Sequence, residues 1–227
     1  MATYACSDLH GCLDTWKQIQ SFLKQDDTIY VLGDCGDRGP QPWKTIKEVL
    51  KDSRAIYLKG NHEQMLVDVM EDYLIYENFV YDSVSLLFSN GGQETALGWL
   101  EEDYRRDWKN LIKNLPIYKI YINSKGDKIY LTHAGFTPKL NQFGFKLPSE
   151  QDLLWDRKHF NDNWLGEKDA YIIHGHTPVS YFNEHDNKIV HYCDGHKINL
   201  DCGTAFCSNH KIGILNLDTF EEYYFEE

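Results

Sequence analysis

The first 75 residues alternate three times between strand and helix patterns, and this order limits the chain to an α/β fold. Short apolar runs, typical of buried strands, lie at residues 3–9, 28–34 and 54–60. Each run is followed by apolar residues at helical spacing, the first time at Leu13, Trp16 and Ile19. Strands joined by helical crossovers pair in parallel, with right-handed connections. We therefore expect a parallel sheet covered by helices.

The second half of the chain is rich in short strand patterns. Residues 118–133 contain two strand patterns around a turn at residues 124–127, which predicts a hairpin. Further strand patterns lie at residues 170–175, 188–193, 196–203, 211–217 and 221–227. Because a single sheet of about ten strands tends to split or curl, we expect two sheets packed face to face with helices outside.

The chain shows no repeat or linker that would divide it, so we expect one domain over residues 1–227. Two segments with many aromatic residues, 76–110 and 136–165, contain none of the strand patterns. We interpret both as loops around the functional site, where they would set its selectivity.

Composition excludes several classes of protein. The 23 basic and 35 acidic residues give a net charge of −12, which argues against nucleic-acid binding. No apolar run approaches the roughly 18 residues that a membrane helix needs, and the first residues lack the pattern of a secretory signal. The six cysteines form no C-x-x-C pair. We therefore expect a cytoplasmic protein with free thiols and no membrane partner.

Polar side chains follow five of the predicted strands, at the point where each strand ends. In open α/β sheets, ligands bind beyond the carboxyl ends of the strands, so these residues should converge on one crevice. In chain order they are Asp8 and His10, then Asp34, Asp37 and Arg38, then Asn61 and His62, then His133, and last His174 and His176.

The mixture of carboxylate, imidazole and amide groups in one crevice indicates bound metal. Any one of these residues alone could be a helix cap or a hydrogen-bonded core residue. Together they would be costly to bury unless positive charge neutralised them. Asp, His and Asn donors suit manganese, iron or zinc. Because there are too many donors for one ion, we expect two divalent ions about 3.5–4 Å apart.

Five motifs, in order and spacing, resemble the metal-dependent phosphoprotein phosphatase family of the calcineurin-like metallophosphoesterases. They read SDLHG, GDCGDRG, GNHE, HAG and GHTP, and the nearest likeness is to the small bacterial and bacteriophage lambda enzymes. Further matches at NGG, LWDR and DCGTAFCSN extend the resemblance over nearly the whole chain. Ser7 and Gly36 depart from the pattern, since the family usually has Gly and Val there. The resemblance implies a four-layer αββα sandwich of two mixed sheets flanked by helices.

The resemblance also implies roles for the residues at the strand ends. Asp8 and His10 would hold the first metal, and Asp34 would bridge both metals. The residues that would complete the second site are Asn61, His133 and His176. His176 matches the family ligand better than His174 does.

A second set of residues would act on the substrate. His62 would be the general acid, oriented by Asp37, because an imidazolium held by a carboxylate can protonate a leaving alkoxide. Arg38 and Arg157, together with Asn61, would bind the substrate phosphate, since arginine forks match phosphate oxygens.

These roles predict a manganese-dependent phosphomonoesterase in which a metal-bridging hydroxide attacks phosphorus in line. We expect a monomer whose substrates are phosphoproteins or phosphopeptides bearing phosphoserine, phosphothreonine or phosphotyrosine. The first alternative is a symmetrical diadenosine tetraphosphate hydrolase, followed by a phosphodiesterase and by a non-catalytic metal-binding scaffold. The roles of Glu63, Cys35 and His174 are left open, Glu63 being either a support for a ligand or the start of a helix.

Overall fold

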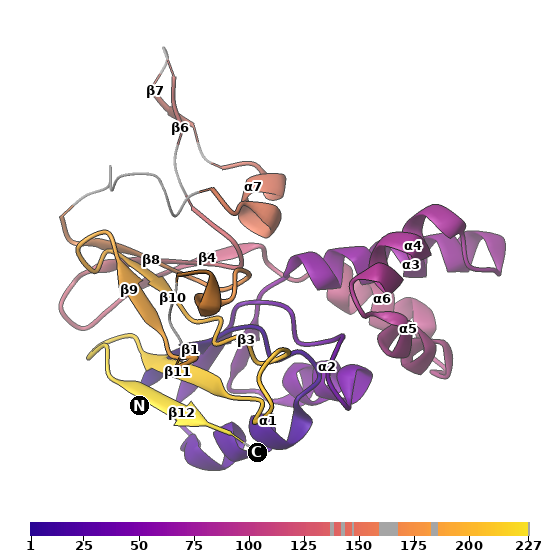
Figure 1. Cartoon of the computed structure of the whole chain (residues 1–227), viewed down its shortest axis with the longest axis horizontal. Helices are drawn as coiled ribbons and strands as arrows, with labels where there is room; N and C mark the ends of the chain where they lie inside the picture. Colours follow the sequence, from indigo (N-terminus) through magenta and orange to yellow (C-terminus); the bar gives the residue numbers. More distant parts are fainter. Residues whose placement is uncertain (137–138, 142–143, 147, 159–167, 183–185, 227) are drawn as a thin grey trace.

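The computed structural model contains two five-stranded sheets and a small two-stranded one (Figure 1). It describes residues 1–136, 139–141, 144–146, 148–158, 168–182 and 186–226. Both large sheets are mixed and helices flank them, as the sequence predicted.

The first sheet is formed by the predicted strand and helix alternation. Strands β1, β2 and β3 are parallel, and two late strands extend the sheet on the β1 side, with β11 antiparallel to β1 and β12 antiparallel to β11. Helix α2 begins with a proline, whose fixed φ suits the first helical turn. The bounds are β1 Thr3–Cys6, α1 Leu13–Phe22, β2 Thr28–Val31, α2 Pro42–Lys51, β3 Ala55–Tyr57, β11 Ile212–Asn216 and β12 Glu222–Phe225.

The second sheet contains the predicted hairpin, formed by β4 and β5. Strands β5, β8 and β10 are parallel, while β4 and β9 pair antiparallel at the two edges. The small β6–β7 ribbon was not predicted from the sequence. The bounds are β4 Tyr118–Ile122, β5 Lys128–Thr132, β6 Lys139–Asn141, β7 Gly144–Lys146, β8 Ala170–His174, β9 Val190–Tyr192 and β10 Lys197–Asn199.

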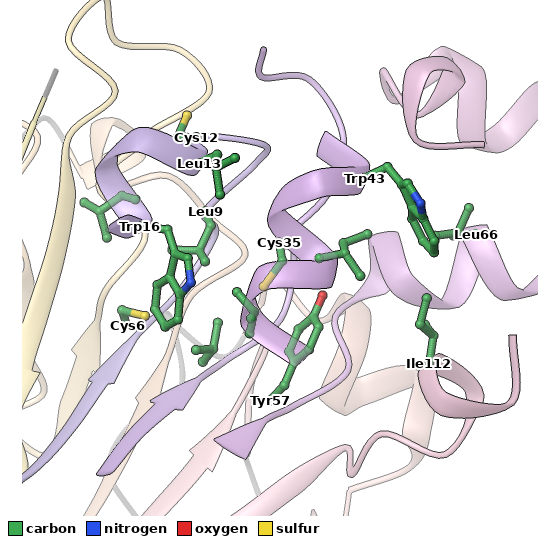
Figure 2. Close-up of a cluster of buried hydrophobic side chains, with 14 of the residues drawn as sticks. Cys6, Leu9, Cys12, Leu13, Trp16, Cys35, Trp43, Tyr57, Leu66 and Ile112 are labelled. Atoms are coloured by element: carbon green, nitrogen blue, oxygen red, sulfur yellow. The ribbon is translucent and has the colours of Figure 1, made fainter. Parts of the chain in front are cut away.

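Alternation along each strand sorts side chains into layers. In β1, Cys6 faces the core under the helices, whereas Ala5 faces the core between the sheets. Figure 2 shows the core under the helices, where Cys6, Trp16 and Cys35 lie together. On the far side of the second sheet, Tyr130 stacks on Phe136 beneath helix α7 (Glu150–Trp155). The strand ends, and the polar residues that follow them, are thus anchored by apolar packing on both faces.

Four helices form a lobe that extends from one side of the sandwich, at the right of Figure 1. The lobe consists of α3 (Asn61–Tyr76), α4 (Tyr81–Ser89), α5 (Gln93–Leu100) and α6 (Arg105–Lys113). Our interpretation of residues 76–110 as loops was therefore wrong. None of α4, α5 and α6 has a side-chain cap at its N-terminus, so the usual start signal is absent, and the helices are stabilised by burial of residues such as Trp99 and Ile112.

The other segment that we interpreted as a loop, residues 136–165, lies partly outside the described residues; its described part includes α7 and the β6–β7 ribbon. Within the described chain, none of the helices combines the length and apolarity that crossing a bilayer requires.

Candidate metal centre and active site

The loops after the strand ends bring the predicted ligands together and bury them. Asp8, Asp34, His10 and His176 are each at most 5% exposed, and all four adopt positive φ, between 41° and 69°. Such φ values are uncommon outside glycine and cost conformational energy unless neighbouring structure holds them. Backbone hydrogen bonds do so here, since the His10 amide donates to the Asp34 carbonyl at 2.9 Å. The sharp turns direct the side chains into one buried cluster.

The cluster consists of two groups of donors that share one carboxylate. The His10 end comprises His10, Asp34 and His62, and the His133 end comprises Asp34, His133 and His176. Within each group the donor atoms lie within 4.8 Å of one another. Asp34 is therefore placed where a ligand shared between two ions would have to be.

At the His10 end, imidazole nitrogens surround the Asp34 carboxylate. Asp34 Oδ2 is 3.9 Å from His10 Nε2 and 3.8 Å from His62 Nε2. His10 Nδ1 lies 3.0 Å from the Gly36 carbonyl, which fixes the ring and directs Nε2 inward. Burial, together with the charges of His62 and Arg38, lowers the pKa of His10 well below its usual value. His10 is therefore held neutral, the form in which imidazole binds metal.

Asp8 lies beside this end but belongs to neither group of three donors. Its Oδ1 is 3.9 Å from His10 Nε2. Its Oδ2 accepts hydrogen bonds from the Ser7 hydroxyl and, at 3.0 Å, from the His176 amide. Ser7, the residue that replaces the usual glycine of the motif, therefore helps to orient Asp8.

At the His133 end, the Asn61 amide lies between two imidazoles. Asn61 Oδ1 is 2.9 Å from both His133 Nε2 and His176 Nδ1. The other nitrogen of His133 is 2.7 Å from the Leu32 carbonyl. Although burial alone would lower it, the pKa of His133 is raised to about 10, because Asp34, at 3.4 Å, favours the imidazolium. Burial and the neighbouring His133 charge lower the pKa of His176 well below its usual value.

The residues of the cluster fit a pair of divalent cations. Asp8 Oδ1 and His176 Nε2 are buried and have no hydrogen-bond partner among the described residues. Buried polar atoms are rarely left unpaired, so these two atoms indicate ligand positions. The pKa of Asp34 is well below its usual value because His133, His62 and His10 outweigh the effect of burial, which keeps the shared carboxylate ionised. The donor types are those of manganese, iron and zinc sites.

The predicted acid, His62, is held by a carboxylate and faces an arginine. His62 Nδ1 is 2.5 Å from Asp37 Oδ2, and its Nε2 is 2.9 Å from Arg38 Nη2. Arg38 Nη1 lies 2.9 Å from His10 Nε2. Because a guanidinium only donates, a proton on His62 Nε2 must displace Arg38. Burial lowers the pKa of His62, but Asp34 and Asp37 outweigh it and the net shift is upward.

His62 lies within reach of the shared carboxylate, so distance alone does not distinguish an acid from a ligand. The bond to Asp37 fixes the proton on Nδ1 and leaves Nε2 facing Arg38, an arrangement that suits either role. Arg157 is exposed and follows α7, and its charge contributes to the lowered pKa of His176. It therefore lies towards the His133 end, whereas Arg38 lies at the His10 end.

Glu63, whose role the sequence left open, supports the cluster from beneath. It is buried, and its carboxylate accepts hydrogen bonds from the amides of Asp34 (2.8 Å), Cys35 (3.0 Å) and Gly60 (2.8 Å) and from the Tyr57 hydroxyl (2.6 Å). Glu63 therefore fixes the end of β2 against the start of α3, and with it the shared ligand.

The two other residues left open belong to neither group of donors found in the described part of the chain. Cys35 is buried, and burial with the Glu63 charge raises the pKa of its thiol well above the usual value, which favours the protonated thiol over the thiolate. His174 is buried with Nε2 2.6 Å from the Tyr192 hydroxyl and Nδ1 3.0 Å from the Gly175 carbonyl. The motif histidine that joins the cluster is thus His176.

Sequence reasoning missed Thr95, which contacts Asp37. Its hydroxyl donates to Asp37 Oδ1 and accepts from the Asp37 amide at 3.0 Å. Because 58 positions separate the two residues, no local pattern could have linked them.

Two packed sheets that gather carboxylates and imidazoles at their strand ends have the donors of a metal-binding protein. The family model described as calcineurin-like phosphoesterase matches residues 1–207, so the chain belongs to this metallophosphoesterase family.

Relatives and neighbours differ in the activities for which they are named. The chain is 26% identical to the asymmetrical bis(5'-nucleosyl)-tetraphosphatase PrpE of Anoxybacillus flavithermus, covering 88% of this chain and 84% of that protein. It is 28% identical to the symmetrical bis(5'-nucleosyl)-tetraphosphatase of Aliivibrio salmonicida, over 62% of this chain and about half (47%) of that protein. A protein serine/threonine phosphatase of Saccharomyces cerevisiae superposes with a TM-score of 0.60 at 13% identity, covering 100% and 80% of the two chains, which shows a common fold.

Proposed function

We propose that this metallophosphoesterase hydrolyses the polyphosphate of dinucleoside tetraphosphates. The similarity to an asymmetrical tetraphosphatase along most of both chains is the observation that carries the proposal. It favours dinucleoside tetraphosphates, the substrate class of the alternative in the sequence analysis, over the substrates of the first choice, a protein phosphatase; that alternative was a symmetrical hydrolase. It also favours asymmetrical cleavage, to a nucleoside triphosphate and a monophosphate.

The residues of the cluster have separate tasks in this proposal. Two divalent cations, with manganese the first choice, would supply the charge that activates water and neutralises phosphate oxygens. Arg38 and Arg157 would bind phosphate oxygens from the two ends of the cluster, as arginine forks do. The residues that would hold the cations are Asp8, His10, Asp34, Asn61, His133 and His176.

His62 would give its Nε2 proton to the leaving group while Asp37 holds Nδ1. The gain in rate from this proton transfer depends on the substrate. An alkoxide leaving group is a much stronger base than the phosphate that leaves when an anhydride is cleaved. The acid is therefore essential for phosphoserine and phosphothreonine and less important for a dinucleoside polyphosphate.

An exposed aromatic ring beside Arg38 supports a nucleotide substrate. Phe206 is 70% exposed, and the guanidinium carbon of Arg38 lies 5.3 Å from the centre of its ring. A base stacked on such a ring gains about 1–3 kcal/mol. A phosphate bound to Arg38 would bring an attached nucleoside close to Phe206.

A phosphomonoesterase acting on phosphoproteins is the second candidate. The observation in its favour is the pair of exposed arginines, since two guanidinium groups suit a dianionic terminal phosphate.

The experiment offers diadenosine tetraphosphate and phosphoserine peptides side by side to the manganese-loaded protein, with products separated by chromatography. We expect a higher kcat/KM for the dinucleotide, with ATP and AMP as products. Phe206→Ala should raise KM for the dinucleotide about tenfold and leave p-nitrophenyl phosphate hydrolysis unchanged. Tyr104→Ala, at a similarly exposed aromatic on α6's N-terminal side, is the control. Preference for the peptides would support the second candidate instead.

A further inference from the structure

Helix α5 of the lobe reaches the acid pair through one buried side chain. Thr95 is fully buried, and its hydroxyl bonds both the carboxylate and the amide of Asp37. These contacts occupy Asp37 Oδ1, while Oδ2 faces His62 Nδ1 at 2.5 Å. The three residues therefore form a chain in which Thr95 fixes the carboxylate that orients the imidazole.

The loop that carries Asp37 needs such support. Asp37 and Arg38 both have a φ of 65°, a conformation that non-glycine residues seldom adopt. The turn between α4 and α5 holds the loop from the other side, since the Arg38 amide donates to the Gly91 carbonyl at 3.0 Å and Arg38 Nε donates to the Asn90 carbonyl at 3.2 Å. A Cβ on Gly92 would lie 2.9 Å from Asp37 Oδ2, so this turn must stay small.

The position of Thr95 depends on the glycine at position 36, where the family pattern usually has valine. A Cβ at Gly36 would lie 3.3 Å from Thr95 Cγ2 and 2.8 Å from Ile46 Cδ1. A larger residue would force the end of the Ile46 side chain to move and would press on Thr95. The unusual glycine and the threonine therefore belong to one packing arrangement in this chain.

We propose that Thr95 is a positioning residue, which fixes the Asp37 carboxylate so that His62 is aimed at the leaving group. The lobe thereby becomes part of the active site. This inference rests on the proposed role of His62 as the acid.

The test compares leaving groups rather than total activity. Thr95→Val keeps the shape of the side chain but removes both hydrogen bonds, and Thr95→Ser keeps the hydroxyl. Thr95→Val should lower kcat for an alkyl phosphate about tenfold, with KM nearly unchanged. It should change kcat for p-nitrophenyl phosphate, whose leaving group needs no proton, by less than about twofold.

Two controls complete the series. Thr95→Ser should restore the alkyl phosphate activity. Thr45→Val changes another fully buried threonine, whose hydroxyl donates to the carbonyl of Gln41, the N-cap of its own helix, and should leave the ratio of the two substrates unchanged. Metal content and melting temperature are measured for every variant. Thr95→Ala takes the place of Thr95→Val should the latter not fold.

An equal loss on both substrates, or no rescue by serine, would overturn the inference and leave Thr95 a packing residue. His62→Ala separates this failure from failure of the proposed function. If His62→Ala shows the leaving-group dependence and Thr95→Val does not, only the role of Thr95 is wrong. If neither variant shows it, the acid role of His62 is wrong as well.

Discussion

The two ends of the metal cluster share Asp34 but differ in what surrounds them. At the His10 end, both imidazoles meet Arg38, an exposed residue held by the lobe. At the His133 end, both imidazoles meet the buried Asn61 amide. The imidazoles of both ends are buried, so the ends differ in the partner of those imidazoles, an exposed guanidinium at the first end and a buried amide at the second.

This difference indicates that the two ends of the cluster have different functions. Groups at the His133 end are fixed by backbone carbonyls and by one another, which suits permanent ligands. At the His10 end, Arg38 and His62 can exchange partners with a substrate, which suits binding and proton transfer. Changes at the His133 end should therefore alter metal affinity first, and changes at His62 or Arg38 should alter turnover first.

Removing the Asp34 carboxylate should lower turnover more than any other change, because both ends of the cluster then lose the negative charge that they share. Asp34→Asn should lower turnover about 1,000-fold or more. The metal content, measured by elemental analysis after dialysis, should fall at the same time. Circular dichroism checks that the variant is folded. A variant that kept two tightly bound ions would show that Asp34 is not shared between the two ends.

The contrast between the ends is tested by a pair of histidine variants. His62→Ala should lower turnover of an alkyl phosphate about 100-fold while metal content is retained, because only the proton donor is lost. His133→Ala should instead lower metal affinity, visible as a higher manganese concentration needed for half-maximal activity. The comparison between the ends would be wrong if the two variants behaved in the opposite way.

Glu63 supports both ends through backbone amides, so its removal should act mainly on stability. Glu63→Gln replaces one acceptor oxygen by a donor that faces donors and should cost about 2–3 kcal/mol in the free energy of unfolding. Urea titration measures this change. Glu102→Gln is the control, because Glu102 bonds Lys47 and Trp43 near the surface and should cost less than about 1 kcal/mol. Equal losses of unfolding free energy in the two variants would show that the hydrogen bonds of Glu63 contribute no more to stability than those of Glu102.

The smallest effect on activity is expected far from both ends, at the Asp52–Arg54 pair. The Arg54 guanidinium donates two hydrogen bonds to Asp52, of 2.9 and 2.8 Å, and the Arg54 amide a third, of 3.0 Å; these bonds lower the pKa of Asp52 to about 2. A lowered pKa contributes stability that is present above the unfolded value, about 4, and is lost as the pH falls towards 2.

Asp52→Asn should therefore cost about 1–2 kcal/mol at pH 7, and the difference from the parent should shrink between pH 4 and pH 2. Urea titrations of both proteins across this range measure it. Turnover at neutral pH should be unchanged. A difference that stays constant with pH would assign the loss to packing instead of charge.

The sequence by itself determined the layout of the strands and the convergence of the donors. The alternation of apolar residues is local, and the carboxyl ends of parallel strands meet at one edge, so Asp8, Asp34 and His133 were predicted to lie together. The motifs also separated His176 from its neighbour His174. None of this required knowledge of contacts between distant residues.

Only the tertiary structure decided the helices of the lobe after α3 and the contacts of Thr95 and Glu63. Helices α4, α5 and α6 lack a side-chain cap at their start and form by burying residues such as Trp99 and Ile112, so the sequence pattern did not indicate them. The contact of Thr95 with Asp37 and the four hydrogen bonds of Glu63 join segments whose separation is set by packing. Local patterns determine where a strand ends, but the partner of a buried side chain depends on which elements pack against it.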